Sequence, residues 1–308
     1  MKMVYPAKEE IPEKRRKKHV GLWILAAVLV LLAALFLDSN LRLTVSRFAV
    51  EDSRLPQAFD GFKIVQLSDL HGARFGEDNV VLAAKVLALR PDMIALTGDF
   101  ISDAKDLPAV QDLLEKFKGV PMYYVTGNHD WASGDIDALF GLLQNCGVTV
   151  LHNEWLTLAR GGERIVLCGV EDPNSWADLE KPDSVVQRMR AAYPDDYVVF
   201  LGHRNYWALR YPELDVDLIL CGHSHGGIIR LPFVGGLFGT SKELTTPVHE
   251  SFFEKVVRTF QNTAPKYEAG LYKTGAYTMI VSRGLGQAPP IPRLLNNPEI
   301  VEITLKAG

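Results

Sequence analysis

Cysteine is scarce in this chain of 308 residues, which has only three, Cys146, Cys168 and Cys221. An odd number of scattered cysteines does not form a disulfide framework, so we expect small buried thiols. Cys221 adjoins a histidine-rich loop, but oxygen and imidazole donors surround it and we do not expect it to bind metal. A strong charge of one sign is also missing. The formal net charge is -4, which gives no indication of a nucleic-acid binder, and none is expected as a partner.

The N-terminal region, in contrast, is strongly patterned. A basic block, Lys14–Lys18, precedes an unbroken apolar run from Val20 to Leu37. A run of about 18 uncharged residues is close to the minimum that crosses a bilayer as a helix. A buried core helix would carry a polar face, and a cleaved signal peptide would need a small-residue cleavage site, which the run lacks.

We therefore predict an uncleaved, single-pass membrane anchor over residues 19–38, preceded by a cytoplasmic basic segment over 1–18. Because positively charged flanks stay in the cytoplasm, residues after 38 are expected on the extracytoplasmic side. Residues 39–61 form a linker with a first strand, which the alternation from Leu41 to Ser46 predicts. The remaining residues, 62–308, are expected to form one domain.

Strands and helices alternate in that domain. Strands are predicted over 62–67, 93–96, 121–125, 148–151, 155–158, 164–169, 197–201, 217–220, 276–282 and 299–305, and helices over 78–90, 106–117, 135–145 and 182–192. The three strands between 148 and 169 are expected to be antiparallel, with a hairpin turn at Gly161-Gly162. The alternation implies a largely parallel inner sheet, in which sites form beyond the carboxyl ends of the strands.

Five of these strands end in residues that can bind metals. They are Asp69 with His71, Asp99, Asn128 with His129, His203, and His223 with His225. Taken singly, each has an ordinary alternative, such as a capping aspartate or a solvated histidine. The glycines around the last pair let the backbone take a tight path that aims both rings at one point. Five strand ends that deliver only Asp, Asn and His to one rim favour a metal site.

These residues resemble the ordered motifs of the calcineurin-like metallophosphoesterase family. The motifs are D-x-H at Asp69–His71, G-D at Gly98-Asp99, G-N-H-D at Gly127–Asp130, the lone His203, and G-H-x-H at Gly222–His225. The match extends from about residue 60 to the C-terminus. Segments 281–286 and 298–300 resemble the membrane-anchored bacterial branch of the family. That branch is similar to phosphodiesterases that act on a UDP-diacylglucosamine pyrophosphate.

The resemblance implies an α/β (α+β) fold, a four-layer sandwich of two mixed β-sheets flanked by helices, here with an N-terminal transmembrane helix. It also implies a binuclear centre of two divalent metal ions, with Mn, Fe, Zn, Ni or Co as candidates. The first ion would be held by Asp69, His71 and His225, the second by Asn128, His203 and His223, and Asp99 would bridge them. His129 would be the catalytic residue that steadies the phosphoryl oxygens or protonates the leaving alkoxide.

Several neighbours of these motifs are less certain members of the site. Asp130 is expected either to hold the other ring nitrogen of His129 or to cap a helix. The second motif is often written G-D-x-x-D, and Ser102 stands at its last position, which puts one supporting contact in doubt. Arg204 and Arg74 could contact a phosphate, but we interpret both as solvated surface arginines and leave them outside the predicted site.

Residues 231–275 are predicted to form an insertion in the domain. Apolar residues over 252–260 fall on one face of a helix. This helix either packs on the core or serves as a lid or membrane-facing element that admits a lipid-like substrate.

The motifs together predict a metal-dependent phosphoesterase that hydrolyses a phosphodiester or pyrophosphate bond of a lipid-linked or nucleotide-sugar substrate. Two cations neutralise the phosphate, generate a bridging hydroxide and clamp both oxygens of the displacement. One alternative is a phosphomonoesterase that acts on phosphoproteins or small phosphate esters. Another is a non-catalytic, metal-holding module at the membrane, but all eight positions of the motifs are present. The expected partners are a phosphate-ester substrate and the membrane.

Overall fold

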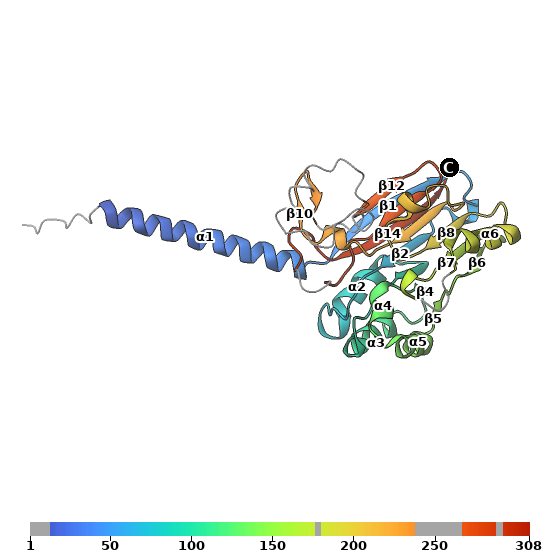
Figure 1. Cartoon of the computed structure of the whole chain (residues 1–308), viewed down its shortest axis with the longest axis horizontal. Helices are drawn as coiled ribbons and strands as arrows, with labels where there is room; N and C mark the ends of the chain where they lie inside the picture. Colours follow the sequence, from blue (N-terminus) through green and yellow to red (C-terminus); the bar gives the residue numbers. More distant parts are fainter. Residues whose placement is uncertain (1–12, 176–179, 238–266, 288–291) are drawn as a thin grey trace, which may run out of the picture.

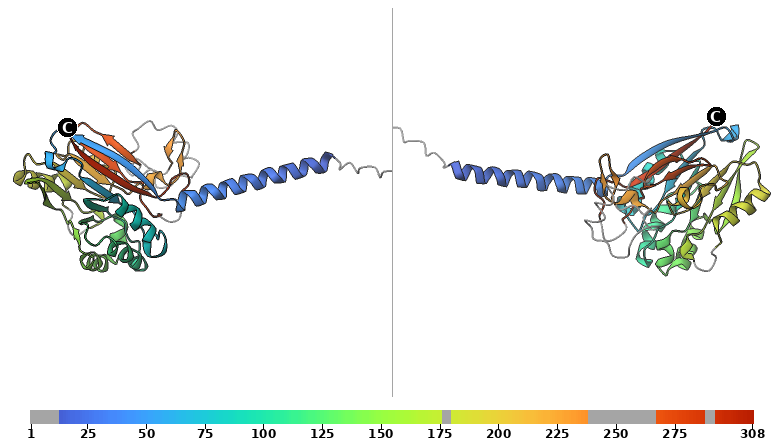
Figure 2. Two further views of the ribbon diagram at one scale, coloured as in Figure 1. Left: turned by 180° about the vertical axis from the view of Figure 1, so that it is seen from behind. Right: turned by 45° about the horizontal axis from the view of Figure 1, so that its top comes forward.

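The computed structural model describes residues 13–175, 180–237, 267–287 and 292–308. A long N-terminal helix projects from a domain that is built from two large β-sheets and the helices that cover them (Figures 1 and 2). The helix that we predict over 252–260 lies outside the described residues.

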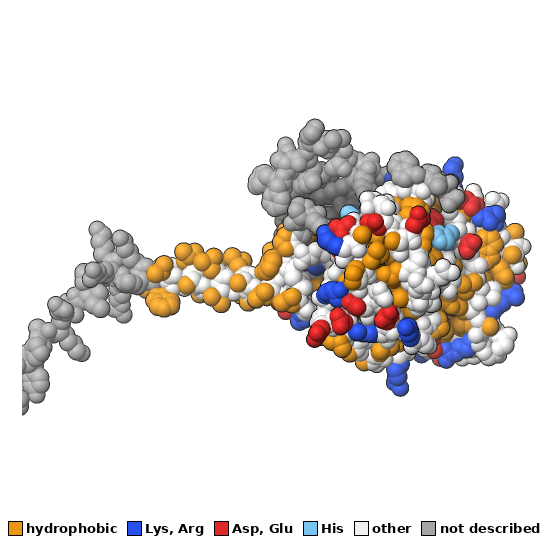
Figure 3. All heavy atoms as spheres, turned by 90° about the horizontal axis from the view of Figure 1, so that it is seen from below, with side chains coloured by type: hydrophobic (Ala, Val, Ile, Leu, Met, Phe, Trp, Pro, Cys, Tyr) orange, Lys and Arg blue, Asp and Glu red, His pale blue; other side chains and the backbone are white. Residues whose placement is uncertain are grey.

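The projecting helix is α1 (Glu13–Leu41). Its segment Val20–Leu41 is long and apolar enough to cross a membrane, and its 18-residue apolar window is not buried against the domain. Figure 3 shows hydrophobic side chains along this segment. The first strand begins at Thr44 and not at Leu41, so the predicted start was wrong. The helical pattern continues instead, because the backbone N–H of Arg42 donates to Asp38 O at 3.2 Å.

The first sheet has the strand order β1-β14-β2-β3-β4-β5. Its strands are β1 (Thr44–Asp52), β14 (Glu299–Ala307), β2 (Lys63–Leu67), β3 (Met93–Thr97), β4 (Met122–Val125) and β5 (Val148–Val150). From β2 to β5 all neighbours are parallel, whereas β14 is antiparallel to β2 and parallel to β1. We expected β5 to pair antiparallel with the strand that follows it, and this was wrong. Leu151 N donates instead to Tyr124 O at 2.9 Å, which keeps this segment beside β4.

The second sheet has the order β12-β13-β9-β8-β7-β6. Its strands are β12 (Gly270–Lys273), β13 (Thr278–Val281), β9 (Leu218–Cys221), β8 (Val198–Leu201), β7 (Glu163–Gly169) and β6 (Glu154–Arg160). The four inner strands are parallel, and both edge strands are antiparallel to their neighbours. Gly161-Gly162 turns the β6–β7 hairpin as predicted. A small separate hairpin consists of β10 (Arg230–Leu231) and β11 (Gly235–Gly236).

The helices form two outer layers. The α-helices of the domain are α2 (Val80–Ala88), α3 (Leu107–Glu115), α4 (Asn128–Ala132), α5 (Ile136–Asn145), α6 (Pro182–Ala192) and α7 (Trp207–Arg210). Short 3-10 helices are η1 (Gln57–Phe59), η2 (Glu77–Asn79), η3 (Ala104–Asp106), η4 (Pro173–Ser175) and η5 (His225–Gly227).

Three buried hydrophobic clusters separate the four layers. Val65 and Leu67 of β2 pack with residues of α2, α3 and α5, while Ile64, which precedes Val65, packs against the second sheet. This is the alternation that a strand imposes on its side chains. A third cluster joins the outer face of the second sheet to α6 and α7. The four-layer sandwich of two mixed sheets is thereby confirmed.

Candidate metal centre

The strand ends that carry the predicted donors meet at one edge of the sandwich. Parallel strands bring their carboxyl ends to the same edge of a sheet, and here both sheets contribute to the same place. The loops are bonded to one another: Asp69 N donates to Gly98 O at 2.9 Å and His71 N donates to Asp99 O at 3.0 Å. In the second sheet, Gly222 N donates to His203 O at 2.9 Å. The donors therefore sit on a connected backbone framework.

The backbone at this edge is strained. Five of the predicted donor residues have left-handed φ angles: Asp69 (53°), His71 (46°), Asp99 (57°), His223 (68°) and His225 (47°). Such angles are uncommon for residues other than glycine and cluster at functional sites. Gly98 shows how tightly the loops pack, because a Cβ atom there would lie 2.6 Å from Gly127 N and 2.8 Å from the ring of His203.

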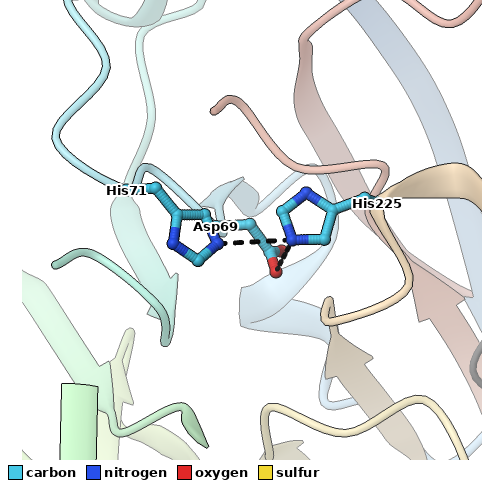
Figure 4. Close-up of side chains that lie close together, drawn as sticks. All are labelled: Asp69, His71 and His225. Atoms are coloured by element: carbon cyan, nitrogen blue, oxygen red, sulfur yellow. Dashed lines mark hydrogen bonds and ion pairs between the residues drawn. The ribbon is translucent and has the colours of Figure 1, made fainter. Parts of the chain in front are cut away.

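Asp69, His71 and His225 form the first group of donors (Figure 4). His225 Nε2 lies 3.3 Å from His71 Nε2 and 3.4 Å from Asp69 Oδ1. The other ring nitrogen of His71, Nδ1, lies 2.9 Å from Ser102 Oγ. Ser102, at the position where the motif often has aspartate, therefore contacts a donor histidine through its hydroxyl.

Asp99, His203 and His223 form the second group. Asp99 Oδ2 lies 3.0 Å from His203 Nε2, which is 3.2 Å from His223 Nδ1. His203 Nδ1 donates to Thr97 O at 2.8 Å. Because a carbonyl oxygen only accepts, Nδ1 carries a hydrogen, so Nε2 is the ring nitrogen that can bind a cation once it has lost its proton. Asp99 Oδ2 is also 3.8 Å from His71 Nε2, so this carboxylate lies between the two groups.

Two buried oxygens indicate that these groups suit cations. Asn128 Oδ1 is buried without a hydrogen-bond partner among the residues described, and Asp99 Oδ2 is buried facing the ring nitrogens of His203 and His71. An unsatisfied buried acceptor costs roughly 1–3 kcal/mol, and a bound cation would satisfy both. Oxygen and imidazole donors without thiolate suit first-row divalent metals. Cys221 is not among them, because it is buried in β9 with its Sγ 3.6 Å from Ile280 O.

The protonation states of the donor side chains are coupled to metal binding. Burial raises the pKa of Asp69 to about 6 and lowers the pKa of His71 to about 4. Burial also opposes a charge on His203, but the contact with Asp99 outweighs it and raises the pKa of His203 to about 10. An imidazole must be neutral to bind a cation, so His203 would release its proton when a metal binds.

His129 follows Asn128 at the start of α4, and its backbone N–H donates to Asp99 Oδ1 at 2.7 Å. Its ring meets the His71 ring edge-on, with 4.9 Å between the ring centroids. The histidine for which we predict a catalytic role is thereby held beside both donor groups.

Comparison with known proteins agrees with this geometry. The model of the family described as calcineurin-like phosphoesterase matches residues 62–227. The chain belongs to this family. It is similar to YkuE, an uncharacterized metallophosphoesterase of Bacillus subtilis, with 31% identity over 84% of each chain. It is also similar to the phosphodiesterase YaeI of Escherichia coli, with 30% identity over 79% of this chain and 82% of that protein.

A cattle protein named as a transmembrane protein with a metallophosphoesterase domain is 32% identical, over 67% of this chain and 51% of that protein. Among solved structures, the NAD nucleotidase of Haemophilus influenzae matches with a TM-score of 0.45 and 16% identity, over 71% of this chain and 44% of that one. The family match and the similarity to these relatives identify the protein as a hydrolase that acts on phosphate esters.

Asp130 supports the site of the phosphoesterase in a way that we did not predict. Its carboxylate accepts hydrogen bonds from five donors: the backbone N–H groups of Asp99 (2.8 Å), Phe100 (2.9 Å), Ile101 (3.1 Å) and Gly127 (2.8 Å), and the Tyr124 hydroxyl (2.6 Å). In the described structure it makes no hydrogen bond to the His129 ring, so that expectation was wrong. The bond from Gly127 caps the start of α4, as the alternative expectation required. The other bonds fix the loop that carries Asp99.

Replacing Asp130 by asparagine should destabilise the protein. The new NH₂ group would face backbone N–H donors, and burial leaves it no water. We expect a loss of about 2–3 kcal/mol in the free energy of unfolding, measured by denaturant titration. Asp103→Asn is the matched control, because Asp103 is an exposed cap of η3, and its change should stay below about 1 kcal/mol. Equal stability of the two variants would contradict this role.

Arg204 lies at the site, contrary to our interpretation of it as a solvated surface arginine. Its Nε and Nη2 donate to the two oxygens of Asp172 at 2.6 and 3.2 Å, and its Nη1 lies 3.1 Å from His223 Nε2. Asp172 follows β7, a sixth strand that ends at the same edge.

Arg74, in contrast, has a side chain that is 44% exposed and pairs with Asp112 at 2.6 Å. The signal for Arg204 in the sequence was its position directly after the predicted ligand His203.

Proposed function

We propose that this phosphoesterase hydrolyses a phosphodiester or pyrophosphate bond with two divalent cations. Asp69, His71 and His225 would hold the first cation, and Asn128, His203 and His223 the second. The observation that carries the proposal is the position of Asp99, whose Oδ2 lies 3.0 Å from His203 and 3.8 Å from His71. A carboxylate between two donor groups is the arrangement that two cations can share.

The chemistry that a pair of divalent cations supplies is charge neutralisation on the phosphate oxygens and activation of water. The side chains of the protein would bind and orient the phosphate and supply a proton to the leaving group. His129 would donate a hydrogen bond to a phosphoryl oxygen or a proton to the leaving oxygen. Arg204, held by the buried carboxylate of Asp172, could donate to another phosphate oxygen.

The position of α1 supports a substrate at the membrane surface. A cavity of about 210 Å³ lies between the base of this helix and the first donor group, and Asn40, His71, Arg74, Gln287 and Arg293 contribute to its lining. An ester bound there would lie level with the end of the apolar segment Val20–Leu41. This favours a lipid-linked substrate over a soluble nucleotide sugar. The basic block at 14–18 would keep the N-terminus cytoplasmic and place the domain on the extracytoplasmic side.

Metal removal and two matched substrates test the proposal. The full chain in detergent is stripped with a chelator, and each of Mn, Fe, Zn, Ni and Co is then added back. Turnover is measured with a chromogenic monoester and a diester that release the same alcohol. We expect no turnover in the stripped protein, recovery at two equivalents of metal, and faster hydrolysis of the diester. Faster hydrolysis of the monoester would favour the phosphomonoesterase alternative, and unchanged turnover after stripping would contradict the metal site.

A further inference from the structure

The base of α1 is bonded to a segment near the opposite end of the sequence. Asn40 Nδ2 donates to Arg293 O at 3.0 Å, and Ser39 Oγ accepts from Leu295 N at 2.7 Å. Asn297 Nδ2 donates to Asp38 O at 2.6 Å. Three successive residues of the helix base therefore hold residues 293–297. The helix is joined to the domain through specific contacts, in addition to its covalent connection to β1.

The same segment holds His225 of the first donor group. Asn296 Nδ2 donates to the carbonyl oxygens of His225 at 2.7 Å and Ile228 at 3.0 Å. The guanidinium of Arg293 lies 3.5 Å from His225 O and 3.4 Å from His225 Nδ1. It also donates to Gly286 O and Arg283 O, both at 2.7 Å. Two side chains thus converge on one residue whose φ is +47°.

The burial of the charged Arg293 side chain costs free energy, which hydrogen bonds offset only in part. Its side chain is among the largest fully buried ones, with an exposed fraction of 1%. In the described ranges its guanidinium forms no ion pair with a carboxylate, and its main acceptors are backbone carbonyl oxygens. A positive charge beside a site for cations opposes their binding. Arg293 instead helps to hold the backbone of His225, because a left-handed backbone conformation there persists only when neighbouring residues stabilise it.

We propose that Arg293 and Asn296 are positioning residues that tie the base of α1 to His225. In this arrangement the helix base is part of the support of the first donor group, and a change at the base alters cation binding at His225. The inference rests on the proposed function only in taking the first group as a cation site. It goes beyond that function because it makes the attachment of the membrane helix a determinant of metal affinity.

The test is Mn²⁺ binding to the full chain in detergent after chelator treatment, followed by electron paramagnetic resonance. Two neighbouring Mn²⁺ ions give a spin-coupled signal that an isolated ion does not. Arg293→Met should weaken the affinity of one of the two sites by about 10–100-fold, since contacts that support metal ligands have effects of this size. Asn296→Ala should act in the same direction. Asn40→Ala should weaken the same site by about threefold or more, although Asn40 forms no hydrogen bond to a donor residue in the described ranges.

Arg47→Met is the matched control, because Arg47 lies in β1 and pairs with Glu302, outside both the helix base and residues 293–297. It should bind both ions like the parent. Melting temperatures of the stripped proteins show which variants are folded, and Arg293→Lys replaces Arg293→Met if the latter does not fold.

Three results would overturn the inference. The first is a folded Arg293 variant, together with Asn296→Ala, that keeps the coupled signal and parental affinities. The second is an Asn40→Ala variant that binds Mn²⁺ like the parent, which would refute the link to α1. The third is a parent chain that binds no pair of ions with Mn²⁺ or with any of Fe, Zn, Ni and Co, as metal analysis after dialysis would show. This last result would refute the proposed function as well, whereas the first two would leave it standing.

Discussion

Asp99→Asn should lower kcat/KM by about a thousandfold or more, which corresponds to roughly 4 kcal/mol of transition-state stabilisation. Asp99 Oδ2 lies close to a histidine ring of each donor group, at 3.0 Å from His203 Nε2 and 3.8 Å from His71 Nε2. An amide offers one oxygen and no negative charge, so it cannot replace a carboxylate that two cations share. The same substitution also removes the charge that raises the pKa of His203.

Metal analysis and kinetics of the same preparation test this expectation. The Asp99→Asn protein should retain fewer than two metal ions per chain after dialysis and should lose turnover of every ester that the parent hydrolyses. Asp215→Asn is the control, because Asp215 is a surface carboxylate that pairs with Arg190, and it should keep parental metal content and rate. Two tightly bound ions and a rate within tenfold of the parent in Asp99→Asn would show that the carboxylate is not shared.

His129→Ala should separate chemistry from metal binding. We expect two bound ions per chain and a kcat lowered by about 10²–10⁴, the range typical for loss of a general acid or base. The reason is positional: the His129 ring lies against His71, with 4.9 Å between centroids, while its backbone and not its ring contacts Asp99. The effect should be larger for an ester with a poor leaving group, which needs a proton more than a good one does.

The control for this change is His152→Ala. His152 contacts Glu171 and Phe140 and is not part of either donor group. Its removal should change kcat by less than about threefold. A His129→Ala protein that hydrolyses both good and poor leaving groups at the parental rate would refute the catalytic role of His129. Loss of metal together with rate would assign His129 a structural role instead.

The predicted donors could be recognised from the sequence because each directly follows a short apolar strand. Asp69 follows β2, Asp99 follows β3 and His203 follows β8, and in each case strand and donor are within a few residues of each other. Parallel pairing of such strands then dictates that their ends lie at a common edge. The four-layer fold came from the family resemblance and not from these local patterns, which gave only the alternation of strands and helices.

What could not be predicted depends on contacts between distant residues. The alternation at Leu41 indicated a strand, but α1 continues to that residue and its base bonds to residues 293–297. The placement of β5 beside β4 depends on a backbone bond between Leu151 and Tyr124. Neither partner is marked by a local pattern, and single-sequence periodicity contains no information on pairing across sheets.

The supporting residues were hidden for a related reason. Asp130 has the spacing of a helix cap, yet most of its hydrogen bonds go to a loop about 30 residues earlier in the chain. Arg293 lies in a segment that the sequence analysis treats as a connection between two closing strands. Its burial and its contact with His225 are visible only in the folded structure. A motif identifies the side chains that face a metal, whereas the residues that hold them are determined by the tertiary fold.

The central claim is that one carboxylate lies between two cation sites built from both sheets, and anomalous X-ray diffraction from crystals of the Mn²⁺-loaded protein tests it most directly. The account predicts two peaks about 3.5–4 Å apart, one beside Asp69, His71 and His225 and the other beside Asn128, His203 and His223, with Asp99 in contact with both. A single peak, or a pair located away from these side chains, would contradict the account.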